Sequence, residues 1–121
     1  MSREKYFKNS LFFQGKNLNY SKNKPKSRSQ ASCLIYENIM LIFGGWNSQG
    51  LDDLWLCDIG DNYSWVLVNP IGKIVPAGRF GHSAVIYKKN VYFYGGIACD
   101  GGAPLEDILI YSICKRIFKL S

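Results

Sequence analysis

Apolar residues occur along this chain in short runs that are separated by polar turns. Between positions 31 and 120 the runs are rich in Ile, Val, Leu, Tyr, Phe and Trp, which are favoured in strands, and no stretch keeps a helical period. Polar tips such as Glu37-Asn38 and Lys88-Lys89-Asn90 separate neighbouring runs as hairpin turns do. The pattern predicts an all-β chain with strands at 31–36, 39–43, 53–57, 64–68, 82–87, 91–94, 107–111 and 117–120.

The order of these runs repeats once. Residues 28–45 align without a gap with residues 79–96, at an interval of 51 residues and with six identities in eighteen positions. Each segment ends in a diglycine, Gly44-Gly45 and Gly95-Gly96, where a strand stops abruptly and the backbone turns in little space. Downstream of the diglycines the apolar runs keep the same order in both segments. The second segment has extra residues, which fall in the loop 97–105, where insertions are tolerated. A repeat of this length predicts stacked units of four strands each.

The repeat resembles the kelch repeat, which is the blade of kelch-type β-propellers. The resemblance covers residues 25–121. The second unit carries the family's pattern at Pro76, Arg79, Gly81-His82-Ser83, Gly95-Gly96, Asp107 and Tyr111. The first unit carries it at Pro25, Arg28, Ser32, Gly44-Gly45, Asp53-Leu54-Trp55, Asp58 and Trp65. The first unit departs from the pattern at Gln30-Ala31 and Cys57, and the second at Ser112 and Phe118.

The resemblance implies an incomplete β-propeller made of antiparallel four-stranded blades. A propeller ring closes with about four to eight blades, and this chain supplies two. We expect a basic, mostly irregular lead at 1–24 with a candidate outer strand of a preceding blade at 11–13, a first blade at 25–75 and a second blade at 76–121. Three origins stay open: a fragment of a larger propeller, a short chain that assembles into rings, and a degenerate product. The first is favoured because cut repeats leave such ends.

Positive charge is concentrated in the first 28 residues. They hold eight Lys or Arg and one Glu, which gives +7, while residues 29–121 hold seven Lys or Arg and eight Asp or Glu, which gives −1. We interpret the lead as a solvated linker, with an arm for nucleic acid or an anionic membrane as the alternative. Nucleic acid is not the expected partner, because the sequence offers no helix for a groove.

The expected location is the cytoplasm, with the nucleus as the alternative. No apolar run approaches the ~20 residues that span a bilayer, and the first residues lack the apolar segment of a signal peptide. A membrane span is therefore not expected.

The titratable side chains form no catalytic or metal-binding pattern. Some kelch-like propellers belong to enzymes, including a copper-radical oxidase whose chemistry needs at least two imidazoles, but this chain has a single histidine, His82. The resemblance implies that His82 belongs to the blade scaffold. We therefore expect no enzyme activity, no metal and no cofactor. The cysteines have no metal-type spacing, and we expect free thiols, with Cys33 and Cys57 facing packed surfaces, Cys99 reactive in a loop, and Cys114 in a turn.

By resemblance, the expected function is protein binding through the loops at the mouth of the ring. The resemblance implies that Arg28 and Arg79 point towards that mouth and can fork onto a carboxylate. It also places there the residues after each diglycine, among them Trp46, Asn47, Ser48 and Ile97. Trp46 is the strongest hot-spot candidate, because Trp and Arg dominate interface energetics. In the alternative, each Arg bonds only loop carbonyls and Trp46 packs between blades. Trp65 and Tyr111 are assigned to the core.

The chain is thus expected to be a kelch-type protein–protein interaction module, a fragment of a larger propeller scaffold or substrate receptor. The expected partners are other proteins or peptide segments, together with missing propeller blades or further copies of the chain, because two blades leave apolar faces uncovered. The alternative is a regulatory kelch segment of a multidomain enzyme, a phosphatase or ubiquitin-ligase component, whose catalytic part is not in this chain.

Overall fold

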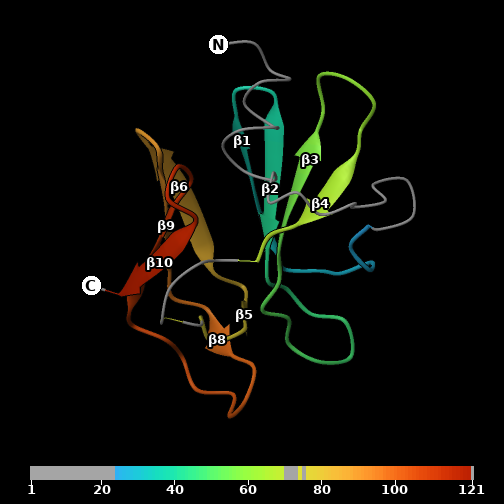
Figure 1. Cartoon of the computed structure of the whole chain (residues 1–121). Helices are drawn as coiled ribbons and strands as arrows, with labels where there is room; N and C mark the ends of the chain where they lie inside the picture. The colour runs from blue at the N-terminus through green and yellow to red at the C-terminus, as the bar shows by residue number, and fades with distance from the viewer. Residues whose placement is uncertain (1–23, 70–73, 75, 121) are drawn as a thin grey trace.

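Two four-stranded antiparallel sheets and one short two-stranded sheet make up the fold. The computed structural model describes residues 24–69, 74 and 76–120. The first sheet has the order β1-β2-β3-β4, built from Ser32–Tyr36, Ile39–Phe43, Leu54–Asp58 and Trp65–Leu67. The second has the order β10-β9-β7-β6, built from Ile117–Leu120, Ile108–Ser112, Asn90–Tyr94 and Ser83–Tyr87. The small sheet pairs β5 (Arg79–Phe80) with β8 (Ile97–Ala98), and Figure 1 shows it at one end of the two larger sheets.

The predicted all-β architecture is confirmed. Each of the eight predicted strands is present, with limits that differ by at most one residue, and the described residues contain no helix. The β5–β8 pair was not predicted, because strands of two residues leave no periodic signal in a sequence. The candidate strand at 11–13 lies outside the described residues.

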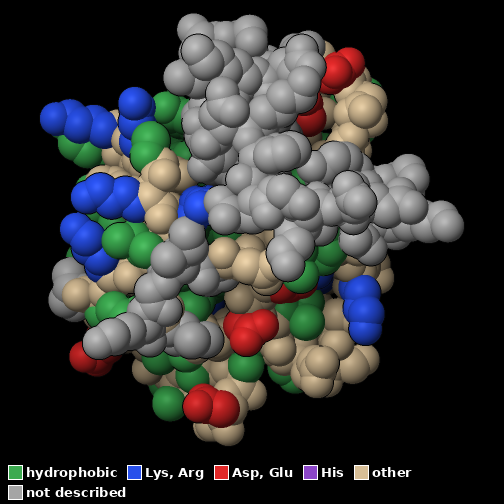
Figure 2. Space-filling view, viewed as in Figure 1, with side chains coloured by type: hydrophobic (Ala, Val, Ile, Leu, Met, Phe, Trp, Pro, Cys, Tyr) green, Lys and Arg blue, Asp and Glu red, His purple; other side chains and the backbone are tan. Residues whose placement is uncertain are grey.

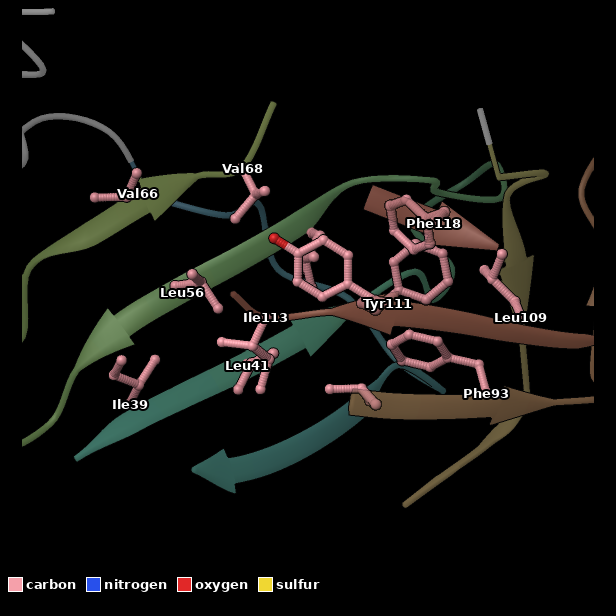
Figure 3. Packing of buried hydrophobic residues seen from close by; sticks show 13 residues of the cluster. Ile39, Leu41, Leu56, Val66, Val68, Phe93, Leu109, Tyr111, Ile113 and Phe118 are labelled. Atoms are coloured by element: carbon pink, nitrogen blue, oxygen red, sulfur yellow. The ribbon is translucent and has the colours of Figure 1, made fainter. Parts of the chain in front are cut away.

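The core lies between the two large sheets. Alternation along β2 buries Ile39, Leu41 and Phe43, and alternation along β7 buries Val91 and Phe93. The rings of Phe43 and Phe93 meet across the interface with centroids 4.6 Å apart. Figure 3 shows side chains of the first sheet pointing towards those of the second. The two sheets therefore pack face to face as neighbouring blades of a partial propeller.

The faces that turn away from this interface hold the remaining side chains of each strand. Leu34 and Tyr36 of β1 pack against the core, so Cys33, one residue earlier in the alternation, points away and is exposed. The expectation that Cys33 faces a packed surface is therefore wrong, whereas Cys57 is buried as expected. Trp65 is half-buried and pairs with Cys57 on β3, while Tyr111 is fully buried against Phe118, with ring centroids 4.9 Å apart.

The diglycine of the first blade lies where the second blade crosses it. Gly44 and Gly45 have φ of 68° and 105°, in the left-handed region that favours glycine. The amide of Gly45 donates to the Arg79 carbonyl at 2.9 Å, and a Cβ on Gly44 would lie 2.5 Å from that same oxygen. The equivalent Gly95 has φ of 74°, but a Cβ there would meet its nearest atom, the Leu105 carbonyl oxygen, at 3.7 Å. Gly44 and Gly95 thus share a backbone conformation, but only Gly44 is in close contact with another blade.

We predict that Gly44→Ala destabilises the chain more than Gly95→Ala. Both substitutions place a side chain at positive φ, which costs about 1–2 kcal/mol. Gly44→Ala adds the overlap with the Arg79 carbonyl, worth about 1–3 kcal/mol more. Urea unfolding followed by circular dichroism measures both, and Gly101→Ala is the control because nothing lies within 4 Å of a Cβ there. Equal losses at Gly44 and Gly95 would contradict the close approach of the second blade.

Candidate partner-binding surface

Each blade holds the residue after its diglycine against the segment that precedes its first long strand. In the first blade the amide of Ser29 donates to the Trp46 carbonyl at 3.0 Å, and the amide of Trp46 donates to the Ser29 carbonyl at 2.8 Å. In the second blade Phe80 of β5 pairs with Ile97 of β8. The Gly45 amide, next to Trp46, donates to the carbonyl of Arg79 in β5, so both pairs lie at the end that carries β5 and β8 in Figure 1. The two blades therefore present equivalent positions on a hydrogen-bonded backbone at one end of the structure.

Three apolar side chains from both blades join into one surface. Trp46 packs on Phe80 with ring centroids 5.0 Å apart, and Phe80 lies opposite Ile97 in the β5–β8 register. Trp46 is 40% exposed and Ile97 is 37% exposed, while Phe80 is half-buried beside them. We call Trp46, Phe80 and Ile97 the loop-end ridge. The ridge combines exposed apolar area with backbone positions that are held by hydrogen bonds, which is what a binding anchor needs.

Asn47 and Ser48 continue the first-blade loop beside the ridge. The side-chain amide of Asn47 donates to the Ser27 carbonyl at 2.7 Å, and its backbone amide donates to the Gln49 carbonyl at 2.9 Å. Ser48 is exposed and has φ of 60°. The loop is thus held by the hydrogen bonds of Asn47, and exposed Ser48 lies two residues after Trp46.

Both arginines fork onto carboxylates of the chain itself. Arg28 donates through Nη1 and Nη2 to the two carboxylate oxygens of Asp53, and its Nη1 also donates to the Gly44 carbonyl at 3.1 Å. Arg79 makes the equivalent pair with Asp107, at 2.9 and 3.2 Å. The Arg28 and Arg79 side chains are only 7% and 1% exposed. Each arginine therefore lies beneath the surface, joining the segment before the first long strand to the start of the third.

The Asp53 carboxyl titrates below its usual range. Its burial acts to raise the pKa, but the hydrogen bonds and positive charge of Arg28, together with the Trp55 indole at 2.6 Å, outweigh burial and lower the pKa. The Arg28–Asp53 pair is therefore charged at neutral pH.

His82 lies in the interface between the blades. Its Nε2 is 2.8 Å from the Ser32 hydroxyl, both residues are buried, and the imidazole stands edge-on to Phe43 and Phe93 at 5.5 and 5.8 Å between centroids. Burial and the nearby charge of Arg79 lower the pKa of His82 to about 4, against the opposing effect of the Phe43 carbonyl. The imidazole is therefore neutral at physiological pH and bridges blades rather than facing the ridge.

Cys99 fills the gap between the loops of the two blades. A Cβ on Gly50 would fall 1.6 Å from its sulfur, and the Cys99 amide donates to the Gly78 carbonyl at 3.0 Å. Burial, and then the charges of Asp52 and Asp100, raise the pKa of the thiol. A raised pKa lowers the thiolate fraction, which is opposite to what the expected reactive cysteine needs.

The structure brings together some of the expected binding residues and separates others. Trp46, Asn47, Ser48 and Ile97 gather at the loop end, whereas Arg28 and Arg79 sit beneath it. Sequence reasoning missed Phe80, because the equivalent residue of the first blade is Ser29 and the repeat therefore gives no signal there. The part of the chain that the structure describes holds no group of three His, Cys, Asp or Glu suited to a metal ion, and no helix of membrane-spanning length and polarity.

Four-stranded sheets with three such features are typical of kelch-type propeller blades. The features are an arginine that binds a carboxylate through both terminal nitrogens, a diglycine after the second strand, and a histidine buried between the blades. One family model, described as the KLHDC2/KLHL20/DRC7 Kelch-repeats domain, matches residues 8–116. The chain belongs to this kelch-repeat family.

Several curated proteins resemble the chain over part of their length. An F-box/kelch-repeat protein of Arabidopsis thaliana is 33% identical over 85 residues, which cover 64% of this chain and 18% of that protein. Protein ral2 of Schizosaccharomyces pombe is 29% identical over 100 residues, or 77% of this chain and 16% of that protein. The host cell factor homolog hcf-1 of Caenorhabditis elegans is 31% identical over 86 residues, which cover 65% of this chain and 11% of that protein. The aligned part is thus less than a fifth of each relative.

We predict that His82 makes stability depend on pH. Between pH 6.5 and about 4 the His82 side chain is protonated in the unfolded chain but neutral in the folded chain, because burial lowers its pKa. The free energy of unfolding should therefore fall as pH is lowered through this window, by about 3 kcal/mol in all, and stay level above it. Urea unfolding of wild type and His82→Asn at several pH values isolates this contribution from the carboxylates. Identical pH slopes in the two proteins would show that His82 is not buried between the blades.

Proposed function

We propose that the chain is a protein-interaction module that binds a peptide segment of a partner at the loop-end ridge. The observation that carries this proposal is the joining of Trp46, Phe80 and Ile97 into one exposed apolar surface across both blades. Large apolar side chains held on rigid backbone are typical binding anchors, because little conformational entropy is lost when a partner covers them. The kelch-repeat family membership supports the same class of function.

The residues around the ridge suit the supporting roles of such a surface. Asn47 and Ser48 supply polar groups at its edge, where a peptide backbone can be hydrogen-bonded. Arg28 and Arg79 keep the loops in place through Asp53 and Asp107, and their effect on the partner is exerted through this positioning. Neither role involves a reaction, so we propose binding without catalysis.

A second surface supports association with another blade. On the second sheet the residues equivalent to partly buried Leu34 and buried Phe43 are Val85 and Tyr94, which are 60% and 56% exposed. Tyr87 on the same face is 62% exposed. We propose that this face takes a further kelch blade, as the first sheet takes the second, because such an apolar face is costly to leave in water. A further copy of the chain can supply that blade.

The ridge is tested with peptides selected for binding. A random-peptide phage library is panned on the full chain, and the enriched peptides are made with a fluorescent label and titrated by anisotropy. We expect Trp46→Ala and Ile97→Ala to weaken binding about tenfold or more, as for hot-spot residues. Tyr63→Ala is the control, because Tyr63 is 67% exposed on the turn at the other end of the first sheet. Unchanged affinity in both ridge variants would reject the ridge as the binding surface.

The blade-docking face is tested by light scattering after gel filtration. We expect the wild-type chain to self-associate and Val85→Asp to return it to a monomer, because the substitution places a charge in the middle of the apolar face. Tyr63→Asp is the control at an exposed site outside that face. A wild-type chain that stays monomeric over a wide range of concentration would reject a further copy as the occupant.

A further inference from the structure

The end of the structure opposite the ridge is built from hairpin turns, and in each blade two turns lie side by side. In the second blade Asn90 pairs with Ser112, and the Ile113 amide donates to the Lys89 carbonyl at 3.0 Å. In the first blade the Ile59 amide donates to the Asn38 carbonyl at the same distance. The β6–β7 turn is thus tied to the β9–β10 turn, as the β1–β2 turn is tied to the β3–β4 turn.

The two turns of the second blade carry four cations and no acid. Lys88 and Lys89 lie in the first of them, and Lys115 and Arg116 lie in the second. The three lysines are exposed and Arg116 is half-buried. The ion pairs found within the described residues are Arg28–Asp53 and Arg79–Asp107, which leaves these four cations without a carboxylate partner there. We call Lys88, Lys89, Lys115 and Arg116 the basic turn cluster.

The turns of the first blade show that the fold does not require this charge. Glu37 stands where the second blade has Lys88, and the two residues share the left-handed backbone, with φ of 54° and 55°. Tyr63 and Arg116 likewise share φ of 56° and 57° in the other turn. The same left-handed position is thus occupied by an acid or an aromatic ring in the first blade and by cations in the second, so the charge of the cluster is a property of the surface rather than a requirement of the backbone.

An exposed aromatic ring borders the cluster. Tyr87 is 62% exposed, and the Lys88 ammonium lies 5.4 Å from the centre of its ring. In Figure 2 blue side chains gather on the side of the second sheet, and red side chains lie near the β3–β4 turn. The surface thus offers several positive donors on the second blade and acidic groups on the neighbouring blade, while Tyr87 belongs to the open sheet face.

We propose that the basic turn cluster binds a short acidic peptide segment of a partner protein. Asp or Glu side chains of the segment would pair with the four cations. The site lies on turns at the end away from the ridge, so it is distinct from the surface proposed for the module's main function. A blade that covers the open sheet face leaves these turns in solvent.

The neighbouring blade favours a short peptide over a long polyanion. Glu37 and Asp61 are exposed in the adjacent turns, and residues 37–38 and 59–63 contain no cation. Packed sheets lie about 10 Å apart, close to the Debye length of about 8 Å at physiological salt, so these acids act on anything that spans both blades. An RNA strand or an anionic membrane would meet this repulsion, whereas a segment confined to the second blade avoids it.

The test compares one charge change at two places on the full chain. Lys88→Glu with Lys89→Asn copies the first-blade turn, Glu37-Asn38, which already fits this geometry. Lys24→Glu with Lys26→Asn is the matched control at exposed residues near the ridge end, and each pair of substitutions lowers the formal net charge from +6 to +3. Circular dichroism confirms that both variants fold. The probe is a fluorescent ten-residue peptide of Asp, Glu and Gly with one Tyr, measured by anisotropy.

We expect the turn variant to bind this peptide about tenfold more weakly than wild type, and the control variant to bind it nearly as wild type does. A peptide with Asn and Gln in place of the acids should not bind. Trp46→Ala should leave the affinity unchanged, which separates this site from the ridge. Equal losses in both charge variants would show that only net charge matters. Tighter binding of oligouridine or of phosphatidylserine vesicles, lost in the turn variant, would assign the cluster to a polyanion instead.

Discussion

The junction at Arg79 is the interaction on which the rest of the structure depends. Its carbonyl accepts from Gly45 of the first blade, its amide donates to the Leu51 carbonyl, and its guanidinium holds Asp107 of the second blade. Because the residue is 1% exposed, an unmet polar group there would cost about 1–3 kcal/mol. The carbonyl, the amide and the guanidinium of Arg79 each have a partner, and these partners come from both blades. The sheets consequently meet in one register, which brings Phe43 against Phe93 and Trp46 onto Phe80.

Most of the fold was open to prediction from the sequence, because it follows from local periodicity and from a repeat. The long strands are apolar runs of the length that strands have, and the diglycines fix where β2 and β7 end. The β5–β8 pair and the exposure of Cys33 could not be predicted in the same way. The former consists of strands of two residues, which leave no periodic signal, and the latter depends on which alternate positions of the edge strand β1 face the partner sheet.

The candidate site was predictable only in part, for a related reason. Residues after the diglycines were expected at the loop end because the repeat marks them, and Trp46 and Ile97 do lie there. The residue equivalent to Phe80 in the first blade is Ser29, which is not aromatic, so only the packing of the two blades reveals Phe80. The carboxylates opposite Arg28 and Arg79 are 25 and 28 residues away in the sequence, a distance at which no local pattern assigns partners. Side-chain contacts between residues far apart in the sequence, within a blade or between blades, are therefore what the sequence alone did not predict.

The hydrogen bonds between the blades also set an order for folding during synthesis. In the first blade the Gly45 amide donates to the Arg79 carbonyl, and the Gln30 carbonyl accepts from the Gly81 amide. Arg79 and Gly81 both belong to the start of the second blade. Strands β1 to β4 contain their own pairing partners, but their loop end lacks these two hydrogen bonds until residues 79–81 have been synthesised. The hydrogen bonds of the first blade are therefore complete only when the start of the second blade has been synthesised.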